Sequence, residues 1–425
     1  MEGYKRDKQI LRDLALRLAE ISSDPRQETL RKEWIKHNDM EQVAPRVLIY
    51  PDGDGAWREI IPPETLRVSD PFLRECEYQL RQKIYHWEHF HDDFVFEPEI
   101  NIDCVGEYTG YHYAKADHTT AWGLSIQGQS PADLNGGSYA FKPALNTEED
   151  LQVFLSHKLD FIYDETETKK RVEMLEDILG DILKVTLSLP YVVLVASLLI
   201  ELVHLRGLTQ MLFDLYDKPE FFHRVMEHMS SSKLELLQRL ERENRLFLNN
   251  KASYTGSGGL AYTNRLPQKD YNGSRVRLKD LWGFADAQEF TDVSPDMFRE
   301  FVLPYQKKAL SGFGLVCYGC CEKLDDKLDD ILEIPNIWRI SVSPWSDINI
   351  AAEKIGRKCI YSRKPNPSFV AEKIDEEAVK NDLKNVLEAA KGCNLEIILK
   401  DLRTCGGNPE NLIRWVDIAQ SICKG

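Results

Sequence analysis

Thiol, hydroxyl and charged side chains directly follow four β-rich runs in the C-terminal part of the chain, at residues 314–318, 337–342, 358–362 and 395–400. In a parallel α/β barrel, catalytic groups lie where each strand ends and its βα loop begins. A purely structural scaffold has no need for such groups at all four ends, so the pattern predicts one active site. The strand-end residues are, in order, Tyr318, Cys320, Cys321 and Glu322; Ser341 and Ser343; Ser362, Arg363 and Lys364; and Lys400, Asp401, Thr404 and Cys405.

The cysteines among these residues suggest metal chemistry. Zinc favours thiolate and imidazole ligands, and a catalytic zinc keeps three protein ligands and one open position. Cys317 and Cys320 have the spacing of a ligand pair, and Cys320 and Cys405 follow strands that would share one barrel mouth. A zinc ion there could lower the pKa of a methyl-accepting thiol. The alternative is that these are small buried residues, because free cysteine is among the most buried residue types.

Other polar residues support narrower interpretations. Asp286 and Gln288 follow a strand-like run and could bind substrate, although ordinary loop polarity explains them equally well. Lys400 and Asp401 could be a functional pair or a salt bridge that closes the last strand, and function is the favoured interpretation. His204, after a long apolar run, is assigned to substrate binding, with a satisfied core histidine as the stronger alternative.

Two further residue groups complete the candidate list. Ser343, at the end of the second run, is assigned to substrate binding with the residues above. The segment TGSGG at 255–259 does not match a dinucleotide-binding fingerprint, which requires G-x-G-x-x-G at the opening of a helix.

The elements that would position these residues alternate between strand and helix. Helical segments at about 322–333, 346–356, 375–391 and 409–423 separate the four runs, which indicates parallel βα units. Apolar runs near Val185 and at 278–284 extend the series toward eight strands. Upstream, the pattern predicts charged helices over 4–42, a loop-like connection over 43–66, a helix over 71–91, a strand from Asp93, and loops with short strands over 100–145 that cap one barrel end. The predicted fold is α/β, a (β/α)8 TIM barrel with an N-terminal helical extension and a loop-rich insertion.

Composition narrows the classes of function. The chain has 425 residues and a net charge of −15, which argues against nonspecific binding to nucleic acid or to an anionic membrane. Nine cysteines are too few for a disulfide scaffold and indicate reduced thiols in a cytoplasmic protein. The N-terminus has no signal-peptide pattern, and the apolar stretch at 185–200 is shorter than the roughly 20 residues of a membrane-spanning helix.

Three segments in order resemble the uroporphyrinogen decarboxylase superfamily. They are RGLTQMLFDLYDKPE at 206–220, SPDMFREFVLPY at 294–305, and the thiol-bearing strand at 316–321 followed by IPN and SVSPWSD. The resemblance covers roughly 180–423 well and 45–180 loosely. It implies a (β/α)8 barrel over residues 93–425, preceded by a helical extension and connection over 1–92.

Two chemistries occur in that superfamily. The decarboxylases carry an arginine-rich N-terminal signature for an acidic tetrapyrrole, and the corresponding VAPRVLIYPDGDGAW has one arginine. The corrinoid-dependent methyltransferases hold zinc with a His-x-Cys motif and a later cysteine, which correspond here to Tyr318, Cys320 and Cys405. Tyr318 therefore replaces the histidine. Glu322, Cys321 or Cys317 could supply the missing ligand; alternatively no zinc is bound, and Glu322 and Tyr318 bind substrate directly.

The resemblance implies a methyltransferase that moves a methyl group between a small methylated compound and the cobalt of a separate corrinoid protein. In this hypothesis Cys320, Cys321 and Cys405 hold zinc, while Glu322, Tyr318, Lys400 and Asp401 take part in catalysis. A decarboxylase-like tetrapyrrole enzyme and a non-catalytic subunit that binds a corrinoid protein are the alternatives. The methyl donor and the direction of transfer stay open, as does a homodimer.

Overall fold

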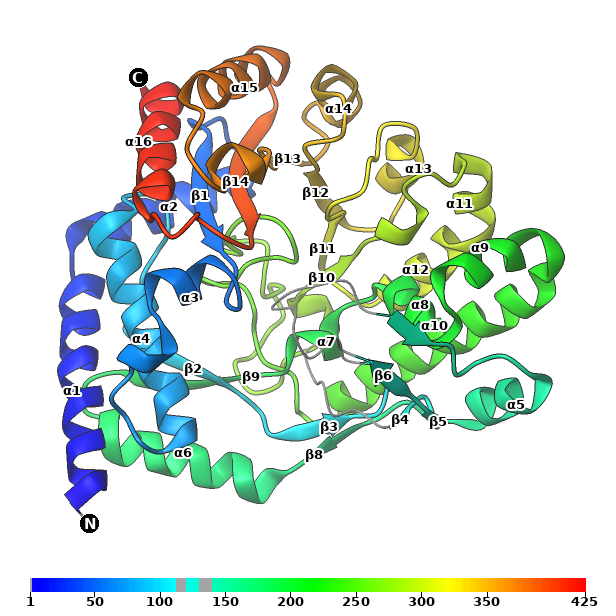
Figure 1. Cartoon of the computed structure of the whole chain (residues 1–425), viewed down its shortest axis with the longest axis horizontal. Coiled ribbons are helices and arrows are strands. Elements are labelled where there is room, and N and C mark those ends of the chain that lie inside the picture. Colours follow the sequence, from blue (N-terminus) through cyan, green and yellow to red (C-terminus); the bar gives the residue numbers. More distant parts are fainter. Residues whose placement is uncertain (1, 112–119, 130–139) are drawn as a thin grey trace.

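The computed structural model describes residues 2–111, 120–129 and 140–425. Six parallel strands form its main sheet, which curves through the molecule (Figure 1). Every residue of β10 and β11 is buried, as expected for parallel strands that are covered on both faces. In sheet order the strands are β1 (Arg46–Pro51), β14 (Asn394–Leu402), β13 (Ile360–Arg363), β12 (Ile337–Val342), β11 (Leu315–Tyr318) and β10 (Trp282–Ala285).

Two further parallel strands, β2 (Glu99–Asp103) and β9 (Lys184–Ser188), pair with each other. Residues close in sequence to this pair contact the two edges of the main sheet. Val195, shortly after β9, forms a parallel bridge with Phe284 of β10, and the Asp93 backbone N–H donates to the Val47 oxygen of β1 at 2.9 Å. The fold is therefore mixed α/β with a curled parallel half-barrel sheet, as the predicted (β/α)8 barrel requires, whereas closure of that barrel stays a prediction.

Helices cover the outer side of the strands (Figure 1). Helix α16 packs beside β1, α14 beside β13 and α12 beside β10. None of the described helices is long and apolar enough to cross a membrane. The helix bounds are α1 (Glu2–Ser22), α2 (Pro25–Asn38), α3 (Ala56–Ile60), α4 (Pro71–His89), α5 (Glu148–Ser156), α6 (Glu165–Leu179), α7 (Tyr191–Leu194), α8 (Leu198–Arg206), α9 (Leu208–Asp217), α10 (Pro219–Arg242), α11 (Pro295–Phe301), α12 (Leu303–Leu310), α13 (Leu328–Leu332), α14 (Ile348–Ile355), α15 (Glu376–Ala389) and α16 (Glu410–Lys424).

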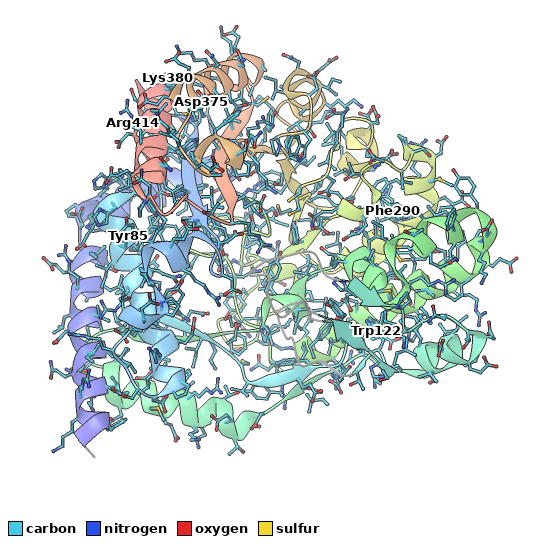
Figure 2. The ribbon with its side chains drawn as sticks, in the orientation of Figure 1. Tyr85, Trp122, Phe290, Asp375, Lys380 and Arg414 are labelled. Atoms are coloured by element: carbon cyan, nitrogen blue, oxygen red, sulfur yellow. The ribbon has the colours of Figure 1, made fainter. Side chains whose placement is uncertain are left out.

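Ion pairs lie within the outer helix α15 and between α15 and α16. Figure 2 shows Lys380 and Arg414 on the outer helices α15 and α16. Both pair with Glu376, Lys380 at 3.2 Å and Arg414 at 2.8 Å. Because exposed ion pairs contribute at most about 1 kcal/mol each, the apolar faces of these helices supply most of the packing energy.

The sequence around helix α4 determines where this helix begins and which of its faces is buried. The Asp70 carboxylate accepts a hydrogen bond from the Leu73 backbone N–H at 3.0 Å, and a proline at the first helical position needs no donor partner. Leu73, Cys76 and Leu80 then fall on one buried face, which packs against α1 in a second apolar cluster that also includes Ile100 and Ile102 of β2.

The insertion between β2 and α6 contains short antiparallel pairs. They are β3 (Gly106–Tyr108) with β8 (Phe161–Tyr163), β4 (Thr120–Ala121) with β5 (Leu124–Ser125), and β6 (Gln127–Gln129) with β7 (Ala140–Lys142). Short strands were predicted for this region. Residues 112–119 and 130–139 of the predicted excursion lie outside the described residues, and its role as a cap on the barrel stays a prediction.

A glycine-containing loop, residues 255–259, lies against the inner face of the sheet. The Gly259 N–H donates to Glu396 of β14 at 2.8 Å, and Thr255 accepts a hydrogen bond from Arg339 of β12. Arg339 and Glu396 are fully buried and form an ion pair at 3.0 Å. Burial opposes ionisation of Glu396, but Arg339 and His37 outweigh it and lower the pKa of Glu396 to about 2.

The predicted C-terminal strands and the helices at 346–356, 375–391 and 409–423 are confirmed within a few residues, as are the charged helices predicted over 4–42. Three expectations are wrong. Residues 46–51 form the edge strand β1 of the main sheet, although a loop-like connection was expected over 43–66. The strand predicted from Asp93 begins only at Glu99, because residues 93–98 make no ladder. The helix predicted over 322–333 covers only Leu328–Leu332, because the segment before it folds into the site described below.

Gly258→Ala should destabilise the protein by about 2 kcal/mol. An alanine Cβ at this position would lie 2.1 Å from Arg339 Cδ, which the ion pair holds in place. Urea unfolding measures the change. Gly53→Ala is the matched control, since its Cβ would meet nothing within 4 Å. Equal stabilities of the two variants would contradict tight packing of the loop against Arg339.

Candidate active site

Two adjacent thiols lie where β11 ends. Cys320 and Cys321 follow Gly319, whose φ of +94° lets the chain turn sharply after the strand. Their sulfur atoms are 3.5 Å apart, and both residues are half-buried. The turn therefore presents a pair of reduced thiols at the carboxyl end of the parallel strands.

Ammonium groups from two neighbouring strand ends surround Cys320. Lys400 Nζ at the end of β14 lies 3.9 Å from the Cys320 sulfur and 3.2 Å from the Ser257 hydroxyl. Lys364, which follows β13, is buried and donates to the Cys320 backbone oxygen at 2.6 Å. Because β11, β13 and β14 are parallel, their ends bring these groups to one edge of the sheet.

These neighbours favour the thiolate form of Cys320. The hydrogen bond from Cys321, and then the charges of Lys364 and Lys400 and the Ser257 hydroxyl, hold the pKa of Cys320 well below its ordinary value against the opposing effect of burial. The same hydrogen bond, together with burial, raises the pKa of Cys321, which keeps its proton. Burial alone would lower the pKa of Lys400, but the negative charges of Cys320 and Asp401 raise it.

Three carboxyl groups, those of Glu322, Asp286 and Glu289, belong to the same site. Glu322 accepts backbone hydrogen bonds from Cys320 at 2.8 Å and from Ala287 at 3.0 Å, so it clamps the loops after β11 and β10 together. Burial raises the pKa of Glu322. Burial, with the charges of Glu322, Cys320 and Glu289 added to it, raises the pKa of Asp286 well above the ordinary value. Burial also raises the pKa of Glu289 to about 7, so burial opposes ionisation of all three carboxyl groups in this site.

Lys400 and Asp401 connect the thiol pair to β14. Their side chains form an ion pair at 3.3 Å, and the Asp401 carboxylate also lies 3.5 Å from the Cys321 sulfur. The predicted pair thus belongs to the same group of side chains as Cys320 and Cys321.

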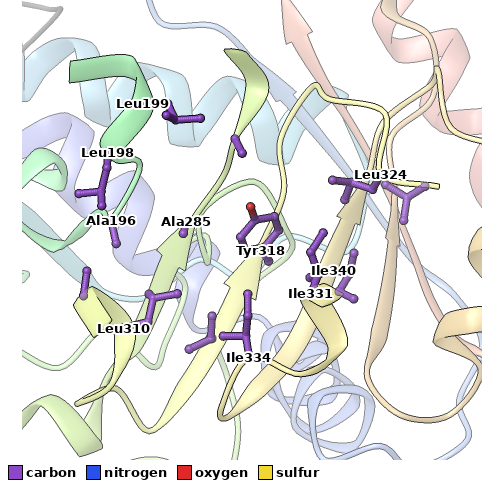
Figure 3. Close-up of a cluster of buried hydrophobic side chains, with 14 of the residues drawn as sticks. Ala196, Leu198, Leu199, Ala285, Leu310, Tyr318, Leu324, Ile331, Ile334 and Ile340 are labelled. Carbon is purple, nitrogen blue, oxygen red and sulfur yellow. The ribbon is translucent and has the colours of Figure 1, made fainter. Parts of the chain in front are cut away.

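Tyr318 lies in the apolar layer between the strands and the helices. Figure 3 shows its ring among Leu310, Ile340 and other buried apolar side chains. Its hydroxyl donates to Gln306 of α12 at 2.9 Å, and Gln306 donates to the Asp286 backbone oxygen at 2.6 Å. Tyr318 is therefore arranged to position the loop that carries Asp286.

Cys405 makes a different set of contacts. Its thiol donates to Glu59 of α3 at 3.1 Å, and Glu59 also accepts the backbone N–H groups of Cys405 and Gly407. Burial and the bond to Glu59 raise the pKa of Cys405 to about 12. The thiol-bearing loop of β11 thus contacts β14 at Lys400 and Asp401, while Cys405 is bound to α3.

The donor set can be tested for the zinc ion implied by the family resemblance. Over residues 2–111, 120–129 and 140–425, no three histidine, cysteine or carboxylate side chains are grouped so that they could hold a metal ion. Cys320 and Cys321 are adjacent, but Cys405 keeps its proton on Glu59. The arrangement does not fit a three-ligand zinc site.

The remaining predicted site residues have local partners. The Gln288 amide donates to the Asp286 carboxyl at 3.0 Å, which places it in the site. The Ser343 hydroxyl accepts from Trp345 N–H in the turn after β12. His204 lies on α8, where Nδ1 is 2.6 Å from the Ile200 oxygen and the ring stacks on Tyr111. Their assignment to substrate binding stays a prediction.

Sequence reasoning did not select Lys364, Ser257 or Glu289 as site residues. In the sequence, Lys364 is one of several polar residues at the strand ends and has no assigned role. Ser257 comes from TGSGG, whose glycines are required because a Cβ at Gly256 would lie 1.9 Å from Phe284. Three glycines within four residues were the available signal for close packing. Two cavities of about 280 and 180 Å³ lie elsewhere, beside Cys104 and beside Lys158 respectively.

Comparisons with known proteins leave the family open. No protein-family model and no curated protein matches the chain. Among solved structures, a methyltransferase from Methanosarcina mazei aligns over 92% of this chain and 98% of its own, with 12% identity and a TM-score of 0.49. A likeness this weak does not show a shared fold or activity, so membership of the uroporphyrinogen decarboxylase superfamily stays a prediction.

Lys400→Met should move the pH midpoint of Cys320 alkylation upward by about one unit. A cation favours the thiolate, so its removal raises the thiol pKa and leaves less nucleophile at a given pH. Iodoacetamide labelling at a series of pH values, with the label localised by peptide fragmentation, measures the midpoint. Lys391→Met replaces an exposed lysine and should leave it unchanged. An unchanged midpoint in Lys400→Met would show that this ammonium group does not stabilise the thiolate.

Proposed function

We propose that the protein is a methyltransferase in which the Cys320 thiolate accepts a methyl group from a small methylated compound. The observation that carries the proposal is a half-buried thiol with Lys400 3.9 Å from its sulfur. The same group of side chains contains a buried carboxyl, Asp286, whose pKa burial raises well above the ordinary value. A thiolate is the reactive form of cysteine, and adjacent cations are the usual means of producing it. The superfamily resemblance of the sequence supports a methyl group as the group transferred.

The chemical step follows from these residues. The thiolate attacks the methyl carbon, a sulfur–carbon bond forms, and the bond from that carbon to its oxygen or nitrogen breaks. The departing atom keeps the electron pair. A departing oxygen also takes the proton of Asp286, which thereby becomes a carboxylate, whereas an ammonium nitrogen departs as a neutral amine and takes no proton. The hydrogen bonds of Glu322 and of the Tyr318–Gln306 pair fix the loop after β10 relative to the loop after β11. The products are S-methylcysteine and the demethylated compound.

A second acceptor must then remove the methyl group if the enzyme is to turn over. The resemblance implies the cobalt of a corrinoid on a separate protein, and such a group would supply a strong nucleophile. When the methyl group leaves Cys320, Lys364 and Lys400 of this chain again stabilise the Cys320 thiolate.

Methyl transfer to Cys320 is tested with isotope-labelled methyl donors. The reduced protein is incubated with methylamines, methanol, aryl methyl ethers, methyl thioethers and quaternary amines, and labelled peptides are identified by mass spectrometry. Label is expected on Cys320 with one donor class and is expected to be lost in Cys320→Ser. Cys393→Ser, which removes a half-buried thiol on the Ala352 oxygen, is the control that should keep it. A panel that leaves Cys320 unlabelled throughout would end the proposal.

Asp286→Asn should slow transfer from methanol and methyl ethers about 100-fold or more, because their leaving oxygen needs a proton in the transition state. Transfer from a quaternary amine should be much less affected, since that leaving nitrogen departs neutral. The labelling rates of Cys320 with the two donor types give the comparison. Equal losses for both types would indicate that Asp286 only positions the thiol.

A further inference from the structure

Cys320 and Cys321 have a geometry that methyl transfer does not require. They are consecutive residues with sulfurs 3.5 Å apart, and both are half-buried. Six of the other seven cysteines are buried and the seventh, Cys393, donates to a backbone oxygen. In the part of the chain that the structure describes, this is the one contact between two thiols for which a hydrogen bond is found. A second thiol held against a nucleophilic one is the arrangement of a resolving cysteine.

We propose that Cys320 and Cys321 form a reversible oxidation site for hydrogen peroxide or a related hydroperoxide. The Cys320 thiolate attacks the peroxide, takes one oxygen to become a sulfenic acid and releases hydroxide, so sulfur is oxidised and peroxide is reduced. Cys321 then attacks the Cys320 sulfur, a disulfide forms and water leaves with the proton of Cys321. The proposal goes beyond methyl transfer and does not require it.

Three features of the site favour this chemistry. Lys400, 3.9 Å from the Cys320 sulfur, stabilises the thiolate that reacts with peroxide. Cys321 is in contact before any movement, so the sulfenic acid can be captured before further oxidation makes it irreversible. The Asp401 carboxylate, 3.5 Å from the Cys321 sulfur, can accept the proton that Cys321 loses.

The disulfide would be easily reduced. Consecutive Cα atoms are about 3.8 Å apart, whereas the Cα atoms of disulfides usually lie about 4.4 Å apart or more. A bond between neighbours is therefore strained, and strained disulfides are readily returned to thiols by cellular reductants. Because the nucleophile is consumed in this bond, oxidation would switch the site off and reduction would restore it.

The experiment uses the full chain without any methyl donor. Reduced protein is treated with hydrogen peroxide, free thiols are blocked with N-ethylmaleimide, and the peptide containing both residues is measured by mass spectrometry. The expected product has lost two hydrogens, remains unblocked at Cys320 and Cys321, and reverts with dithiothreitol. Cys317 lies in the same peptide, so Cys317→Ala should form the product as well, and Cys393→Ser is the control outside the loop.

Two variants separate the roles of the sulfurs. Cys321→Ser should accumulate a sulfenic acid at Cys320 that dimedone traps and that proceeds to sulfinic acid, while Cys320→Ser should give no oxidised product in this peptide. A disulfide from Cys320 to another cysteine, or equal sulfinic acid yields with and without Cys321, would overturn the assignment. Since no methyl donor is present, a negative result here leaves the labelling experiments on Cys320 unaffected, and a failure of those leaves this one intact.

Discussion

The buried ion pair between Arg339 and Glu396 holds together parts of the chain that are far apart in sequence. Both side chains are fully buried, and an ionised group at such a position is tolerated only when charge and hydrogen bonds compensate it. Compensation comes from His37 and Asn38 at the end of α2 and from the 255–259 loop. The N-terminal helices, the loop and the strands β12 and β14 must therefore assemble together, because the absence of any one leaves a buried charge without its partners.

The same constraint determines the chemistry at the strand ends. With Gly259 and Thr255 fixed on the ion pair, Ser257 lies where its hydroxyl reaches Lys400, which in turn lies beside the Cys320 sulfur. Two ammonium groups then face one thiolate and the Asp401 carboxylate, so the local charge is close to balanced. A further anion among them would be unpaired and poorly hydrated. Burial accordingly raises the pKa of Asp286 well above its ordinary value, and the negative charges of Glu322 and Cys320 add to this effect.

The sequence correctly predicted the strands whose residues are mostly apolar and the helices with regularly spaced apolar residues, because those patterns are visible within a few consecutive residues. The strands β11–β14 are buried on both faces, so they appear as short apolar runs between helices of ordinary length. β1 was missed because RVLIYP is flanked by proline and glycine, and only its pairing with β14 makes it a strand. Likewise, the expectation that catalytic groups follow the carboxyl ends of parallel strands identified Cys320, Cys321 and Lys400, because parallel topology alone brings them together. Cys405 satisfies the same rule, but its partner is Glu59, 346 residues away, which no local pattern indicates.

Asp401 shows how the end of β14 combines regular pairing with a strained position. It adopts a φ of +61°, a left-handed conformation that is uncommon outside glycine and that aspartate tolerates better than most residues. Such positions persist where the surrounding contacts fix them. Here the Asp401 carboxylate lies 3.3 Å from Lys400 Nζ and 3.5 Å from the Cys321 sulfur. A glycine would adopt the turn at lower cost but would leave Lys400 without this counter-charge. The free-energy cost of the left-handed conformation at Asp401 is thus offset by its contacts with Lys400 and Cys321. This is expected if the conformation serves the chemistry of the thiol pair rather than the stability of the fold.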